Sequence, residues 1–284
     1  MHHFTTLIDA NTLSQHLSRD DLTLFDCRFD LGNVQWGEAE FARAHLPGAI
    51  YLHLDRDLSG PVTASSGRHP LPDPDAFAAR LAALGASPGR QFVAYDQGNA
   101  AYAARLWWLA RWIGLRNVAV LDGGLAAWRA AGLPLETAVH TPKPGALPVS
   151  LVADAWVSSE TVDDLRQRPG NLLIDARGAE RFAGKNETLD KVAGHVPGAR
   201  NRPFLDNLGA DGRFLPAEVL RHRFGTLLGS VPPTSVIAMC GSGVTACHNL
   251  LALEHAGLTG ARLYAGSWSE WIRDPRRPVA TGAY

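Results

Sequence analysis

One cysteine stands on a turn whose composition favours thiol chemistry. Cys240 follows the apolar run 236–239, and after it come the residues GSGVT and a helical pattern that ends near His255. Two glycines allow the backbone to curl tightly, so successive N–H groups point inward, and the N-terminus of the next helix adds positive potential. Such surroundings favour the thiolate, the nucleophilic form of cysteine. The pattern therefore predicts that Cys240 is a nucleophile, against the alternative of a buried structural cysteine.

A nucleophilic cysteine on such a turn suits either phosphoryl transfer or sulfur transfer. Phosphatases of this layout need an arginine six positions after the cysteine, because a guanidinium grips phosphoryl oxygens bidentately. That position is Ala246. The small residues of the turn also suit a single sulfur atom on the cysteine better than a tetrahedral phosphate. The turn therefore favours sulfur transfer.

The elements that position this turn come from an internal repeat. Three segments of the first half recur in the second half in the same order, at offsets of 149, 150 and 144 residues. They are LFDCR (24–28) with LIDAR (173–177), HLPGA (45–49) with HVPGA (195–199), and FVAYD (92–96) with VIAMC (236–240). Ordered matches at nearly constant offset predict two copies of one domain. We place the copies at 1–136 and 152–284, joined by the proline-rich linker 137–151.

Each copy alternates short apolar runs with helical patterns, which predicts an α/β fold. Strands separated by helices form a parallel sheet with helices on both faces. The functional residues of such sheets lie beyond the carboxyl ends of the strands. Asp26, Asp96, Asp175 and Cys240 all have that position in the sequence.

Composition excludes several partners. The chain has 27 Lys and Arg against 28 Asp and Glu, a net charge of -1 that does not attract nucleic acid or anionic lipid. No apolar run approaches the 18 residues of a membrane span. Three cysteines, few and odd in number, suit a reducing compartment, so we expect a cytoplasmic protein.

Essentially the whole chain resembles the tandem-domain rhodanese family of sulfurtransferases. FARAHLPGA at 41–49 is similar to the N-terminal signature of the family, and ARLYAGSWSEW at 261–271 to its C-terminal one. CGSGVT at 240–245 resembles the 3-mercaptopyruvate branch, whereas the thiosulfate branch usually carries Arg and Lys after its cysteine. The resemblance implies two rhodanese-like domains, the first of them inactive with Asp96 in place of the cysteine.

The resemblance also implies a mechanism. The Cys240 thiolate takes the outer sulfur of the donor as a persulfide and passes it to cyanide or to a thiol such as thioredoxin or glutathione. No metal or organic cofactor is needed. We expect 3-mercaptopyruvate as the donor. Thiosulfate is the alternative donor, and a persulfide carrier that serves a protein partner is the alternative role.

The family assigns further side chains to the site. Arg181 binds the anionic group of the donor, and Ser242 acts with a histidine and an aspartate of the first domain. Their counterparts here are His69 and Asp55, with Asp57 as a rival for the aspartate. The other residues that we expect around the donor are Arg177, Gly241, Gly243, Val244 and Thr245.

The repeat separates residues expected to take part in the reaction from residues expected to build the fold. Cys240, Ser242, Thr245 and Arg181 have no equivalents in the first copy, whereas the histidines of the two His-x-Pro-Gly turns, at 45 and 195, are shared and so are expected to be structural. The aspartates at 26 and 175 are shared as well, and we expect them to brace neighbouring loops.

The chain departs from the family in one segment. Mercaptopyruvate enzymes usually carry a second arginine between the Arg181 position and the following turn, but residues 183–194 contain none. Lys185 or Lys191 could substitute, although an ammonium does not make the bidentate fork of a guanidinium. The choice of donor therefore stays open, with 3-mercaptopyruvate favoured.

Overall fold

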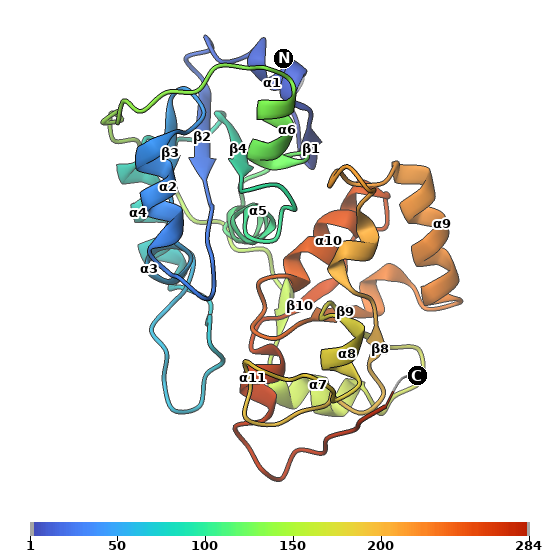
Figure 1. Cartoon of the computed structure of the whole chain (residues 1–284). Helices are drawn as coiled ribbons and strands as arrows, with labels where there is room; N and C mark the ends of the chain where they lie inside the picture. The colour runs from blue at the N-terminus through green and yellow to red at the C-terminus, as the bar shows by residue number, and fades with distance from the viewer. Residues whose placement is uncertain (1–2, 283–284) are drawn as a thin grey trace. The chain divides into compact units, whose positions relative to one another are not determined.

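The computed structural model describes residues 3–282 and divides the chain into two compact units (Figure 1). The first unit comprises Met1–Gly60, Pro72–Val152 and Ala210–Phe214, and the second comprises Pro61–Leu71, Ala153–Gly209 and Leu215–Tyr284.

Two short segments are exchanged between the copies. Residues 61–71 belong to the first copy in sequence but to the second unit in the structure, and residues 210–214 the reverse. The domain boundaries predicted from the repeat do not contain this exchange. In 61–71 the Arg68 N–H donates to Ser269 Oγ at 3.0 Å, which ties this segment to the second unit. In 210–214 the Phe214 N–H donates to the Asp122 carboxylate at 2.8 Å, within the first unit.

The first unit is built on a parallel five-stranded sheet. Its strand order is β1-β5-β4-β2-β3. The strands are β1 (Leu7–Ile8), β2 (Leu22–Asp26), β3 (Ala49–Tyr51), β4 (Gln91–Tyr95) and β5 (Val118–Leu121). The helices are α1 (Ala10–Ser14), α2 (Trp36–Arg43), α3 (Leu54–Asp57), α4 (Pro74–Ala83), α5 (Ala103–Trp112) and α6 (Gly124–Ala130).

The second unit repeats this architecture. Its parallel sheet has the order β6-β10-β9-β7-β8, which is the order of the first sheet with each strand replaced by its counterpart. The strands are β6 (Trp156–Val157), β7 (Leu172–Asp175), β8 (Arg200–Asn201), β9 (Val236–Met239) and β10 (Arg262–Tyr264). The helical segments are α7 (Ser159–Leu165), α8 (Ala179–Phe182), η1 (Phe204–Asn207), α9 (Ala217–Leu228), η2 (Pro233–Ser235), α10 (Ala246–His255) and α11 (Ser267–Trp271). The predicted fold class is confirmed.

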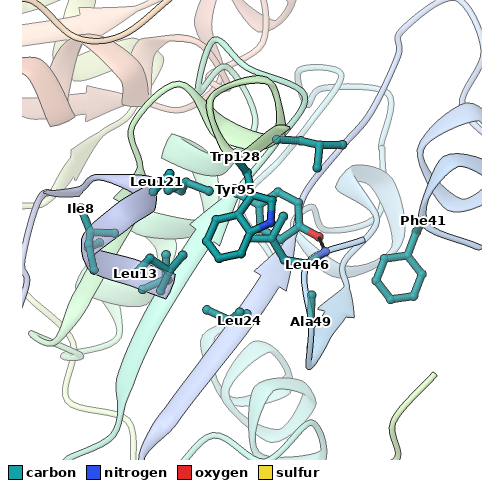
Figure 2. Close-up of a cluster of buried hydrophobic side chains, with 13 residues drawn as sticks. Ile8, Leu13, Leu24, Phe41, Leu46, Ala49, Tyr95, Leu121 and Trp128 are labelled. Carbon is teal, nitrogen blue, oxygen red and sulfur yellow. Dashed lines mark hydrogen bonds between the residues drawn. The ribbon is translucent and has the colours of Figure 1, made fainter. Parts of the chain in front are cut away.

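Successive side chains of a strand point to opposite faces of the sheet, and in the central strands β4 and β9 both faces are buried. In β4 of the first unit, Val93 and Tyr95 join the core cluster that Leu13 of α1 and Trp128 of α6 complete (Figure 2). Phe92 points the other way and stacks on Phe25 with 6.2 Å between ring centroids. Every residue of β4 and of β9 is buried, which explains why these strands are almost entirely apolar in sequence, with Gln91 of β4 as the polar exception.

The two copies keep the same histidine brace. His45 stacks on Phe41, and its Nδ1 lies 2.7 Å from the Phe41 carbonyl oxygen. His195 stacks on Phe182, and its Nδ1 lies 2.7 Å from the Phe182 carbonyl oxygen. Both imidazoles are fully buried, so these shared histidines hold the chain before each Pro-Gly turn.

The linker packs as part of the first unit. The Gly145 N–H donates to the carbonyl of Ala82 at the end of α4, and the Val152 N–H donates to the carbonyl of Trp112 at the end of α5. Among residues 3–282, no helix combines the length and the apolar character that a membrane crossing requires.

Candidate active site

The Cys240 turn joins β9 to α10 and is held by hydrogen bonds from the backbone. Cys240 is 2% exposed, and its N–H donates to Ser267 Oγ at 3.0 Å. Its Sγ accepts the N–H of Gly243 at 3.1 Å. The N–H groups of Trp268 and Ser269, at the start of α11, donate to the carbonyls of Cys240 and Gly241. Cys240, the nucleophile predicted from sequence, thus lies on a turn whose backbone is hydrogen-bonded to the first residues of α11.

Gly243 is the residue that lets the turn close. Its φ is +80°, and a Cβ at this position would lie 2.3 Å from the Ala265 carbonyl oxygen. No side chain fits there, because the atom it would meet is backbone. Glycine at position 243 is therefore required by the packing of the turn against the loop after β10.

Ser242 and His69 form a buried pair at the turn that carries Cys240. Ser242 Oγ and His69 Nδ1 lie 2.7 Å apart, and the two residues are 7% and 6% exposed. His69 belongs to Pro61–Leu71, which packs in the second unit. Gly67 of the same segment backs onto the Gly266 carbonyl, where a Cβ would lie 2.6 Å from the oxygen. The pairing of a serine on the turn with a histidine from the first copy, expected by resemblance, is present in the structure.

Arg181, at the end of α8, lies beside the turn with two acidic partners. Its Nε and Nη2 donate to the Glu187 carboxylate at 2.9 to 3.2 Å, and Nη2 also lies 3.2 Å from an Asp190 oxygen. Both acidic side chains are almost fully buried, at 2% and 4% exposure, and that of Arg181 is 24% exposed. Arg181 is therefore fixed in place and still reachable.

Arg68 brings a second guanidinium to the same place. Its Nη1 hydrogen-bonds the other Asp190 oxygen. A Cβ on Gly241 would lie 2.9 Å from Arg68 Nη2, and 3.6 and 3.7 Å from Nη2 and Nη1 of Arg181. Lys185 and Lys191, the substitutes considered from sequence, are exposed side chains of the segment 183–194.

The two acidic residues titrate in opposite directions. Burial opposes ionisation of Glu187, but hydrogen bonds from Arg181 and from the N–H groups of Leu189 and Asp190 outweigh it and lower the pKa of Glu187. Burial raises the pKa of Asp190; the Glu187 charge adds to this and the charges of Arg68 and Arg181 oppose it. Asp190 is therefore the carboxylate of this cluster that gives up its charge more readily.

Arg177 is placed differently from the other predicted donor-binding residues. Its guanidinium bonds the Asp175 carboxylate at 2.7 to 3.1 Å and the Gly194 carbonyl at 2.8 Å, and its side chain is 1% exposed. Arg28 makes the same bonds to Asp26 and to the carbonyl of Ala44 in the first unit. Since the copy that lacks the cysteine keeps this arrangement, we assign Arg177 to bracing the scaffold.

The remaining predicted residues fall in two places. Val244 is buried, and Thr245 is half-buried at the start of α10. Asp55 and Asp57 lie in α3 of the first unit, where Asp55 is exposed and Asp57 pairs with Arg80 at 2.8 Å. A role for either aspartate with Ser242 and His69 stays a prediction.

Sequence reasoning missed Arg68, Glu187 and Asp190. A signal was present, because four positions separate the stacked Phe41 and His45 whereas thirteen separate Phe182 and His195. The second copy thus carries a nine-residue insertion that supplies both acids. Arg68 adjoins the predicted His69 in sequence, but nothing in the chain itself showed which unit this segment joins.

Comparison with known proteins agrees with this geometry. Residues 9–131 and 158–274 each match the model of the rhodanese-like domain. The chain is 51% identical over 278 residues to a probable 3-mercaptopyruvate sulfurtransferase of Pseudomonas aeruginosa, covering 97% of this chain and 98% of that one. It is 39% identical over 266 residues to a putative thiosulfate sulfurtransferase of Mycobacterium tuberculosis, covering 93% and 92%. The structure of a 3-mercaptopyruvate sulfurtransferase from Leishmania major superposes with a TM-score of 0.84 at 33% identity, covering 95% of this chain and 76% of that one.

Proposed function

The chain belongs to the rhodanese family, with two tandem rhodanese-like domains, and from this premise we propose that it is a 3-mercaptopyruvate sulfurtransferase whose nucleophile is Cys240. The observation that carries the proposal is the Cys240 turn, which combines a buried sulfur, a serine–histidine pair and two arginine side chains within one unit. The similarity to sulfurtransferases over nearly the whole chain supports the same reaction class.

In the first half-reaction the Cys240 thiolate attacks the sulfur of 3-mercaptopyruvate. The S–S bond forms as the C–S bond breaks, and the electron pair of that bond passes to carbon as the enolate of pyruvate. The proton of the donor thiol ends on the methyl carbon of pyruvate, so the products are the Cys240 persulfide and pyruvate. The chemistry uses no metal and no redox cofactor.

The serine–histidine pair gives this proton a path. Ser242 Oγ and His69 Nδ1 are within hydrogen-bond distance, so a proton on one can move to the other as charge develops on the leaving enolate. Arg181 binds the carboxylate of the donor through charge-assisted hydrogen bonds, which orients the C–S bond toward Sγ. The aspartate that the family resemblance adds to this pair, Asp55 or its rival Asp57, keeps its place in the proposal.

In the second half-reaction an acceptor attacks the outer sulfur. A thiolate acceptor leaves as its own persulfide, cyanide leaves as thiocyanate, and Cys240 returns to the thiolate. Thioredoxin and glutathione are the thiol acceptors that we propose. The three cysteines are free thiols in the structure, and we place the protein in the cytoplasm, where such acceptors are kept reduced.

Thiosulfate is the second candidate donor. The 39% identical relative from Mycobacterium tuberculosis carries the name of a putative thiosulfate sulfurtransferase. Against it stands the turn itself, because residues 241–245 carry none of the cationic side chains that a thiosulfate dianion would need.

Intact-protein mass spectrometry tests the proposal. Reduced protein is incubated separately with 3-mercaptopyruvate and with thiosulfate, beside Cys240→Ser and the matched control Cys27→Ser, in which the lost thiol is one whose pKa is raised by burial and by neighbouring carboxylates. We expect one added sulfur with 3-mercaptopyruvate in the wild type and in Cys27→Ser, and none in Cys240→Ser. A gain with thiosulfate alone would move the assignment to the second donor, and no gain with either would contradict a sulfurtransferase.

A further inference from the structure

Two arginine side chains meet one internal carboxylate next to Gly241. One oxygen of Asp190 accepts from Arg68 and the other lies 3.2 Å from Arg181 Nη2, so Asp190 bridges the two guanidinium groups. Both arginines reach the position that a Gly241 side chain would fill. The pair is therefore built to bind a carboxylate immediately beside the nucleophilic turn.

The backbone fixes the position of Arg68. Its N–H donates to Ser269 Oγ, and Gly67 packs closely against Gly266 in the loop before α11. Two neighbouring residues of this segment then contact two neighbouring residues of the turn. The Arg68 guanidinium lies next to Gly241, and His69 hydrogen-bonds Ser242. A side chain held this way loses little further freedom on binding a donor.

Exposure separates the arginines of the cluster. The side chains of Arg68 and Arg181 are 29% and 24% exposed, whereas that of Arg177 is 1% exposed and committed to Asp175. A donor from solvent therefore meets Arg68 and Arg181. No second arginine is present in 183–194, so Arg68 is the residue that supplies the second guanidinium from another segment of the chain.

Charge balance shows what must change when an anion enters. Three arginines face three carboxylates in this cluster, so an arriving carboxylate adds an unbalanced negative charge. The three pairs are Arg177 with Asp175, Arg181 with Glu187, and Arg68 with Asp190. Of the two acids that contact Arg181, Asp190 has a raised pKa and Glu187 a lowered one, because hydrogen bonds outweigh burial only at Glu187. The carboxylate of Asp190 is therefore the easier one to displace.

We propose that Arg68 is a specificity-determining residue that, together with Arg181, binds the carboxylate of the sulfur donor at the place where Asp190 lies in the free protein. This inference rests on the proposed function, because it takes a donor carrying a carboxylate. It assigns Asp190 a competing role: the donor exchanges one carboxylate for another on the same two guanidinium groups.

Steady-state kinetics on the full chain test the proposal. Pyruvate release is measured against 3-mercaptopyruvate concentration, with dithiothreitol as the acceptor, for the wild type, Arg68→Ala, Arg68→Lys and Asp190→Asn. Arg168→Ala serves as the control, since Arg168 is an exposed arginine of the same unit paired with Asp164. We expect KM to rise about 10-fold or more in Arg68→Ala with kcat within about threefold, and Arg68→Lys to recover part of that loss.

Asp190→Asn gives the second readout. Removing the competing charge is expected to lower KM for 3-mercaptopyruvate, whereas a purely structural Asp190 would raise it or lower kcat. A KM within about twofold of wild type in Arg68→Ala, or a raised KM in Asp190→Asn, would overturn the inference while wild-type pyruvate release still upholds the proposed function. A wild type that releases no pyruvate would end both.

Discussion

The two copies contain the same turn after the same strand and fill it differently. After β4, the Asp96 carboxylate accepts four backbone N–H groups, those of Gly98 and Ala100 on one oxygen and those of Tyr102 and Ala103 on the other, at 2.9 to 3.2 Å. After β9, Cys240 Sγ accepts the N–H of Gly243. In both copies the first residue after the strand thus accepts backbone N–H groups of its own turn, four at Asp96 and one at Cys240. The first copy closes the turn with the Asp96 carboxylate, and the second presents it to the Cys240 thiol, which we propose takes sulfur from a donor.

The surroundings of the two turns differ as much as the turns do. The second copy carries the insertion with Glu187 and Asp190, and it receives Arg68 and His69 from the segment 61–71. Identical braces, Arg28 with Asp26 and Arg177 with Asp175, hold both sheets. The two copies therefore share one scaffold and differ in the side chains that surround the turn.

Two opposite substitutions, Gly243→Ala in the second turn and Ala100→Gly in the first, are expected to differ most in their effects. Gly243→Ala places a methyl group 2.3 Å from a backbone oxygen at φ +80°, so we expect sulfur transfer to fall more than about 100-fold and stability to drop by about 3 kcal/mol or more. In the first turn the left-handed residue is Ala100, at φ +57°. Ala100→Gly is expected to be neutral or to stabilise by up to about 1 kcal/mol. Thermal unfolding and pyruvate release measure both, and a fully active Gly243→Ala would contradict the packing described for the second turn.

Ser242→Ala tests whether the serine of the second turn takes part in the reaction. The variant removes the partner of His69 without touching the sulfur, so we expect kcat to fall about 10- to 100-fold, with a smaller change in KM. Ser230→Ala, at an exposed position of the same unit, is the matched control. An unchanged kcat would remove the serine–histidine pair from the proton path.

Asp96→Ala tests the internal anion of the first turn. Four backbone N–H groups, two of them buried and two partly buried, lose their acceptor. We therefore expect the free energy of unfolding to fall by about 2–4 kcal/mol, measured by urea denaturation. Burial raises the pKa of Asp96 and the four N–H groups oppose that shift. Asp30→Ala, an exposed aspartate of the same unit, is the control. A loss below about 0.5 kcal/mol would mean that the carboxylate is not what holds the turn.

Glu187→Gln tests the inserted segment and has the smallest expected effect. The carboxylate accepts from Arg181 and from two backbone N–H groups, so we expect a loss of about 1–2 kcal/mol at neutral pH. Burial opposes ionisation, the hydrogen bonds prevail, and the pKa in the folded state lies below the ordinary 4.5. The stabilisation is therefore complete above pH 4.5 and disappears as pH falls through the lowered pKa. A difference between variant and wild type that stays constant into that acid range would contradict this assignment.

The sequence repeat was enough to predict the parallel sheets, because short, mainly apolar runs and ordered matches are present in both copies. The Cys240 turn was predictable for a related reason, since two glycines after a buried strand leave few alternatives. Arg177 shows what the repeat adds to the resemblance. It is predicted to lie around the donor, and its guanidinium bonds Asp175 and Gly194 just as that of Arg28 bonds Asp26 and Ala44 in the first copy. Arg68 shows the limit of the sequence, because the unit that a proline-rich segment joins depends on packing such as the Ser269 hydrogen bond.

The most direct test of one active and one closed turn is a single-turnover measurement without acceptor. Wild-type protein is mixed with excess 3-mercaptopyruvate, and pyruvate is counted per chain in the first burst. One pyruvate per chain, reduced to none in Cys240→Ser, is the predicted result. No burst, or a burst that persists in Cys240→Ser, would contradict the assignment of sulfur transfer to the second copy.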